Sequence, residues 1–135
     1  MGKSLIQTTN QSTQSVANES IISLGSVLRR YGCNCRLSGN AIEIVGEGYY
    51  KIDAQVSIEP TAEGNVIVAL YNNGVQVQGA IAYGSTSTAT NPVTLPIQTT
   101  IRQGCKCCDS ADSLTLVLIE GAGDVTNVSM RVEKS

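Results

Sequence analysis

The sequence has no histidine, no tryptophan and no phenylalanine, and its only aromatic side chains belong to five tyrosines. Without histidine the chain has no imidazole base, no Ser-His or Cys-His dyad and no metal site built on histidine. With so few aromatic rings, the core has to be filled by Val, Ile, Leu and Ala. The excess of β-branched residues among these favours sheet over helix.

Basic runs are missing as well. Lysine and arginine total 9 against 11 acidic residues, the formal net charge is −2, and Arg29-Arg30 is the one adjacent basic pair. Nucleic-acid binding needs several cations on one face, so nucleic acid is not an expected partner. No apolar run approaches the ~18–20 residues of a membrane helix, and the N-terminus lacks the apolar core of a secretory signal. The sequence therefore indicates a product of a cytoplasm, with no signal peptide and no membrane partner.

The acidic residues give no pattern that carries chemistry. Asp53 and Glu59 alternate with apolar residues, which is typical of the solvent face of a strand and not of a catalytic pair. Asp109, Asp112 and Asp124 lie near turns, but their spacing is not that of a calcium-binding EF-hand loop. No glycine-rich segment has phosphate-loop spacing before a helix. We expect no enzyme, no catalytic residue, no cofactor and no metal.

Residues 46–60 give the clearest structural signal in the chain. From Tyr50 to Ile58 every even position is apolar, and from Lys51 to Glu59 every odd position is polar. That alternation predicts a strand with one face on a core and one face in water. Glycines open the segment and Pro60 closes it, as turn residues do.

Further short strands follow the same logic. Asn73-Gly74 between apolar runs predicts a type I′ hairpin, because both central residues of that turn take positive φ. Pro96 inside an alternating run indicates an edge strand or a bulge. Residues 65–71 and 114–119 are apolar on both faces, so part of their surface is expected to face other subunits. With no convincing helix and turns about every ten residues, the chain predicts a two-sheet sandwich or a barrel.

The first 18 residues are rich in Gln, Ser, Thr and Asn. Only Leu5, Ile6 and Val16 have side chains able to join a core, and ordering such a segment costs roughly 1–2 kcal/mol per residue. We therefore expect a flexible N-terminal arm over residues 1–18, which docks on a partner through those three side chains. A single domain over residues 19–135 is expected to follow.

The five cysteines form the one constellation with competing interpretations. Cys33 and Cys35 share a face if their segment is extended, as do Cys105 and Cys107, with Cys108 opposite. Two such pairs on neighbouring strands fit disulfides, a four-thiolate zinc site or free buried thiols. Cys-x-Cys is narrower than the usual Cys-x₂₋₄-Cys of zinc sites, which counts against zinc. A cytoplasmic origin counts against disulfides, although a particle released from the cell meets oxidising surroundings, and disulfides rank first. The residues leave all three alternatives open.

Gly48-Tyr49-Tyr50-Lys51-Ile52 resembles the Gly-x-Tyr-x-aromatic/aliphatic strand of the tumour necrosis factor and complement-head jelly rolls. Later segments resemble the bacterial and bacteriophage branch of that superfamily, which includes exosporium glycoprotein heads and phage fibre heads. These segments are residues 61–66, residues 70–75 and Gly79-Ala80. The resemblance covers roughly residues 20–134 and implies an all-β, antiparallel jelly-roll β-sandwich of about 8–10 strands that assembles as a tight homotrimer without catalysis.

The function that the resemblance implies is structural. We expect a homotrimeric head that decorates a phage virion, as a head decoration or a fibre head, made in the host bacterial cytoplasm and attached to another virion structural protein by the N-terminal arm. The alternative is a binding module whose loops recognise a cell-surface glycan or receptor protein. Sugar sites commonly use aromatic platforms, and five tyrosines are few, so this alternative ranks second.

Overall fold

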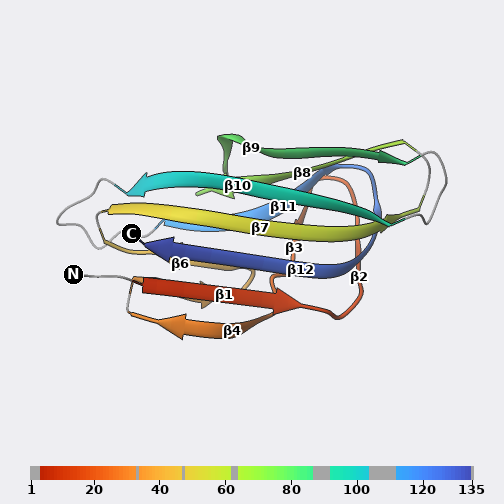
Figure 1. The fold of residues 1–135 in the computed structure, drawn as a ribbon. Coiled ribbons are helices and arrows are strands. Elements are labelled where there is room, and N and C mark those ends of the chain that lie inside the picture. Colours follow the sequence, from red (N-terminus) through yellow and green to blue (C-terminus); the bar gives the residue numbers. More distant parts are fainter. Residues whose placement is uncertain are drawn as a thin grey trace.

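The computed structural model of the protein describes residues 4–32, 34–46, 48–61, 64–86, 92–103 and 112–134. Twelve strands in the described residues form two antiparallel sheets that face each other as a sandwich (Figure 1). Sheet A contains, in spatial order, β10 (Val93–Gln103), β7 (Gly48–Pro60), β12 (Gly123–Lys134), β1 (Ser4–Asn10) and β4 (Ser26–Tyr31), with β2 (Gln14–Val16) paired to β12. Sheet B contains β5 (Cys35–Ser38), β6 (Ala41–Ile44), β11 (Asp112–Glu120), β8 (Gly64–Asn72) and β9 (Val75–Thr86), with β3 (Ser20–Ile22) paired to β11.

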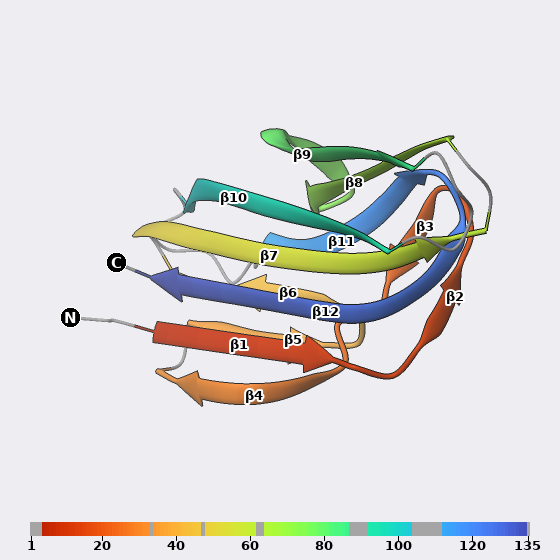
Figure 2. The ribbon, with the colours of Figure 1, turned by 45° about the vertical axis from the view of Figure 1, so that its right-hand side comes forward.

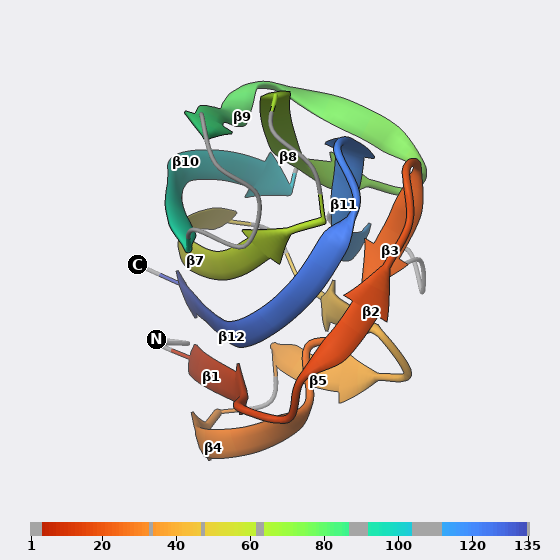
Figure 3. The same ribbon diagram turned by 90° about the vertical axis from the view of Figure 1, so that its right-hand side faces the viewer.

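The sandwich and its jelly-roll order confirm the predicted fold class. From β6 to β12 the chain crosses between the sheets at every step except the β8–β9 hairpin. The described residues contain twelve strands instead of 8–10, because the segment before residue 32 supplies four short ones. Figure 3 shows two of them, β2 and β3, side by side along one flank, where each extends a different sheet. The described residues contain no helix long and apolar enough to cross a membrane.

The strand over residues 46–60 forms as the alternation predicts. In β7 the even positions from Tyr50 to Ile58 are buried, whereas Lys51 is exposed. β7 lies between β10 and β12, so both of its edges are hydrogen-bonded. The buried hydroxyl of Tyr50 lies 2.9 Å from the carbonyl oxygens of Val45 and Gly46, which satisfies its donor. The alternation prediction is confirmed.

The predicted hairpin and the predicted edge position of Pro96 are also confirmed. Asn73 and Gly74 connect β8 to β9 with φ values of 54° and 83°, as a type I′ turn requires. Pro96 lies in β10, which is an edge strand of sheet A and, in the part of the chain that the structure describes, is paired with β7 only. Proline lacks a backbone N–H and is therefore tolerated in such an edge strand.

Small residues let the edges of the two sheets meet at β9 and β10. Ala80 and Ala82 of β9 are buried, and Gly84 continues the same face. A Cβ at Gly84 would lie 2.7 Å from side-chain atoms of both Val93 and Leu95 in β10. The absence of a side chain at Gly84 therefore allows this close approach.

The N-terminal segment contradicts the expectation of a flexible arm. β1 lies inside sheet A, paired along its whole length with β12 and on its other side with β4 (Figure 2). Ile6 is fully buried, and Val16 of β2 is 5% exposed. The segment has few apolar side chains, but β1 is held by backbone pairing on both edges and by small polar residues on its core side. Ser4 is one of these, and its hydroxyl hydrogen-bonds Asn34 at 2.8 Å.

Candidate interaction surfaces

The outer face of sheet B carries an apolar row that crosses four strands. Ile21 of β3 lies opposite Val117 of β11. Val117 in turn lies opposite Ala69 of β8, and Ala69 opposite Ile81 of β9. Directly opposed residues of an antiparallel ladder share a face and touch. We call these four residues the apolar row, and Tyr83, two residues beyond Ile81, extends it with a side chain that is 70% exposed.

The apolar row accounts for the strands predicted to be apolar on both faces. In β8, Val66, Val68 and Leu70 point into the core, and Ala69 lies on the opposite face. In β11 the core positions are Leu114, Leu116 and Leu118, with Val117 outward. The second apolar face of both strands therefore lies on the outside of the sandwich, where it can meet another molecule.

Three more apolar side chains are exposed on β4, at the opposite edge of the sandwich. Val27, Leu28 and Tyr31 of β4 are 42%, 55% and 51% exposed. The β1–β4 register shifts between Gln7 and Thr8, which leaves Leu28 opposite no residue of β1. Val27 lies opposite the buried Thr8, and Tyr31 lies opposite Leu5 on the other face, so the three side chains are exposed along the edge of the sheet and not on one face of it. We call them the β4 cluster. β9 and β4 lie at the two extremes of the molecule, seen at the top and bottom of Figure 1 and again in Figure 3.

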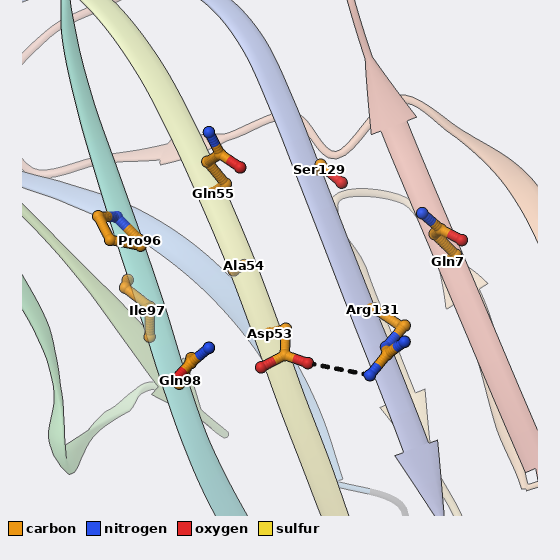
Figure 4. A pocket seen from close by; sticks show the side chains of 9 residues that line it. All are labelled: Gln7, Asp53, Ala54, Gln55, Pro96, Ile97, Gln98, Ser129 and Arg131. Atoms are coloured by element: carbon orange, nitrogen blue, oxygen red, sulfur yellow. Dashed lines mark hydrogen bonds and ion pairs between the residues drawn. The ribbon is translucent and has the colours of Figure 1, made fainter.

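The outer face of sheet A is polar instead. Gln98 of β10 lies opposite Asp53 of β7, and Asp53 opposite Arg131 of β12. Gln7 of β1 completes this row beside Arg131. The Asp53 carboxylate and the Arg131 guanidinium are 3.2 Å apart (Figure 4). Such a half-exposed pair contributes little to stability, but its geometry fixes two charged groups on a rigid sheet.

A depression of about 330 Å³ lies over this row. Strands β1, β7, β10 and β12 line it. On the Asp53 side of the Asp53–Arg131 pair lie Gln55, Pro96 and Gln98, and on the Arg131 side lies Gln7 (Figure 4). Its remaining lining residues are Ala54, Gln55, Pro96, Ile97 and Ser129. The depression lies on the outer face of sheet A and is mostly polar, whereas the apolar row lies on the outer face of sheet B.

Of the five cysteines, the structure describes only Cys35. Its thiol is free and buried at the start of β5. Burial raises the pKa of the Cys35 thiol from 9.0 to about 11, and the nearby charges of Arg30 and Lys134 offset part of that rise. Cys33, Cys105, Cys107 and Cys108 lie outside the described residues. Cys35 is thus a buried apolar residue, and a protonated thiol at neutral pH is a weak nucleophile.

The raised pKa of Cys35 predicts a loss of stability at alkaline pH. Because the folded state holds the thiol proton more tightly, its stabilising contribution is complete below about pH 9 and is lost as the pH rises toward 11. The urea midpoint of the native protein should therefore fall toward that of Cys35→Ala between these two values, with reductant present throughout. A difference between the two proteins that stays constant over that range would contradict the assignment.

The remaining residues singled out in the sequence have structural positions. Asp112 accepts hydrogen bonds from the side chains of Asn72 and Asn73, so it anchors the β8–β9 turn. Asp124 pairs with Glu59 in the β12–β7 ladder, and Asp109 lies outside the described residues. Within the described part of the chain, no three cysteine or acidic side chains come together as a metal site. Leu5 lies between Glu133 and Tyr31 in sheet A and is not part of a free arm.

The sequence predicted an apolar outer face on β8 and β11, but it predicted neither the β4 cluster nor the depression on sheet A. The depression unites residues that are far apart in the sequence, such as Gln7, Asp53 and Arg131. The alternation in β7 identifies Asp53 as a residue facing solvent. Its neighbours on that face depend on strand order and register, for which the sequence held no local signal.

Known proteins resemble this chain in structure but not in sequence. No family model and no curated protein sequence matches this chain. Among solved structures, murine APRIL is similar with a TM-score of 0.74 and 11% identity, over 98% of this chain and 99% of that one. The globular domain of zebrafish complement 1qA protein is similar with a TM-score of 0.68 and 8% identity, over 94% of each chain.

A third similar structure comes from a phage. It is the PRD1 vertex protein P5, with a TM-score of 0.62 and 13% identity, over 99% of this chain and 98% of that one. At these identities the likeness establishes the fold and nothing finer. The resemblance to tumour necrosis factor and complement-head jelly rolls, noted from residues 48–52, is therefore confirmed at the level of the fold.

Proposed function

We propose that this chain is a non-enzymatic structural protein whose jelly-roll heads assemble as a homotrimer on the surface of a phage virion, as a head decoration or fibre head. The observation that carries the trimer is the presence of two different apolar surfaces at opposite edges of the sandwich. These are the apolar row with Tyr83 and the β4 cluster. A rotational ring needs two such surfaces, because each subunit meets its neighbours head to tail.

The number three comes from the resemblance to trimeric jelly-roll heads. In this arrangement the apolar row of one copy packs on the β4 cluster of the next, and three identical contacts close the ring. The fold supports the location as well, since the PRD1 vertex protein P5 shares it along the whole chain. Because β1 belongs to sheet A, attachment to another virion protein would use the surface of the folded head and not a free arm.

Light scattering on the purified protein tests the ring. At micromolar concentration it should give three times the 14.2 kDa chain mass. Tyr83→Asp and Leu28→Asp each place a charge in one of the two surfaces, and each should yield a monomer with an unchanged far-ultraviolet spectrum. Thr100→Asp, on the polar face of sheet A, is the control and should remain a trimer.

A mixture of Tyr83→Asp and Leu28→Asp gives a second test of the ring. Tyr83→Asp keeps an intact β4 cluster and Leu28→Asp keeps an intact apolar row, so together they can form one contact but cannot close a ring. The mixture should give a dimer of twice the chain mass. A monomeric native protein, or variants that both remain trimeric, would overturn this assembly.

The virion location needs a separate measurement. Mass spectrometry of particles purified on a density gradient should find the protein in stoichiometric amounts, and antibodies should label the particle surface. Absence of the protein from infectious particles would overturn the location and leave the ring unaffected.

A further inference from the structure

The depression on sheet A has the dimensions of a small-ligand site. Two cross-strand rows form it, one through Gln98, Asp53, Arg131 and Gln7 and the other through Pro96, Gln55 and Ser129. Strands lie about 4.8 Å apart and same-face residues about 7 Å apart, so four strands and two rows span about 14 Å by 7 Å. An extended ligand of two or three linked rings fits over such a surface.

The polar groups of the depression have free hydrogen-bonding capacity. Gln7, Gln55, Gln98 and Ser129 make no side-chain hydrogen bond to the described residues. Each amide offers two donors and an acceptor, and the hydroxyl offers both. Asp53 and Arg131 remain 44% and 47% exposed beside each other, so each has capacity beyond their single contact. These donors and acceptors stand on hydrogen-bonded strands, which limits the backbone entropy lost when a ligand binds, so the entropy lost is mainly that of the side chains.

The charges of this face favour a neutral ligand. The negative charge of Asp53 lies opposite the positive charge of Arg131, and in the next row Lys51 lies opposite Glu133. An anion would meet Asp53 and a cation would meet Arg131, so neither gains from the pair as a whole. A ligand rich in hydroxyl groups can instead accept from the guanidinium and donate to the carboxylate at the same time.

An apolar element completes the site. Pro96 is exposed on β10 and lines the depression beside Gln55. Its ring presents carbon atoms to the ligand, in the place where an aromatic ring would stand in a chain richer in them. We propose that the depression lined by Gln7, Asp53, Gln55, Pro96, Gln98 and Arg131 binds a neutral oligosaccharide of two or three sugar units. The depression lies within one copy, so this proposal does not depend on the trimer.

Titration of the ¹⁵N-labelled protein tests the proposal by nuclear magnetic resonance. The probes are maltose, cellobiose, lactose and N,N′-diacetylchitobiose, with inorganic phosphate and magnesium chloride as charged comparisons. At least one disaccharide should shift backbone signals of β7, β10 and β12 around the depression, with saturation. The charged probes should cause no saturable shift there.

Matched variants locate the binding. Gln55→Ala and Gln98→Ala should each weaken binding about threefold to tenfold, as expected for one lost hydrogen bond. Gln76→Ala, an exposed glutamine of β9 on sheet B, should leave the affinity unchanged. The proposal is overturned if no disaccharide causes a saturable shift, if the shifts cluster elsewhere, or if phosphate binds this face more tightly than every sugar.

Discussion

Deletion of residues 2–10 is expected to leave a chain that no longer folds. The deleted segment contains β1, which pairs with β12 over seven residues and, among the described residues, is the only strand that pairs with β4. Without it, β4 loses its pairing with β1, the edge of β12 over residues 128–134 is unpaired, and the buried side chain of Ile6 is lost from the core. Truncating one buried Ile to Ala costs ~2–5 kcal/mol, against a total stability of ~5–15 kcal/mol for a whole domain.

Circular dichroism and amide hydrogen exchange measure this effect. The truncated chain should lack a cooperative thermal transition and should exchange its amides at rates near those of an unfolded chain. Deletion of Gly2 and Lys3 alone, which precede β1, is the matched control and should preserve the transition. A truncated protein with a nearly unchanged melting temperature would show that β1 is dispensable and that the segment is an arm after all.

β1 is an example of a strand that the sequence alone does not identify. Its core side is formed by Ser4, Ile6 and Thr8, of which only one is apolar. Hydrophobic periodicity cannot identify such a strand, because backbone pairing with β12 and β4 stabilises it and those partners come from other parts of the chain. The prediction that the segment with Leu5, Ile6 and Val16 is a flexible arm was wrong for this reason.

The elements that were predicted correctly are those whose cause is local. The alternation in β7 and the Asn73-Gly74 turn follow from side-chain parity and backbone preference within a few residues. The jelly-roll fold followed from the motif at residues 48–52 and from the number of short strands. The polar depression did not, since it depends on the order and register of strands up to 124 positions apart, as with Gln7 and Arg131.

A matched pair of substitutions in β7 should show how strongly one face of this strand controls stability. Ile52→Ala is expected to destabilise the protein by ~2–5 kcal/mol, because its side chain is 1% exposed and its removal leaves a cavity in the core. Lys51→Ala, one residue earlier, should change the free energy of unfolding by no more than ~0.5 kcal/mol. Alanine preserves the backbone hydrogen bonds at both positions, so the comparison isolates the side chains.

The two residues differ in what surrounds them and not in their place along the strand. Ile52 lies between Thr99 of β10 and Val132 of β12 on the core side, whereas Lys51 lies between Thr100 and Glu133 on the solvent side. Urea midpoints should be compared at one protein concentration, since subunit association adds to apparent stability. Comparable losses for the two variants would mean that the outer face of sheet A is buried against another subunit, which would place the ring contacts on the polar face and not on the apolar row.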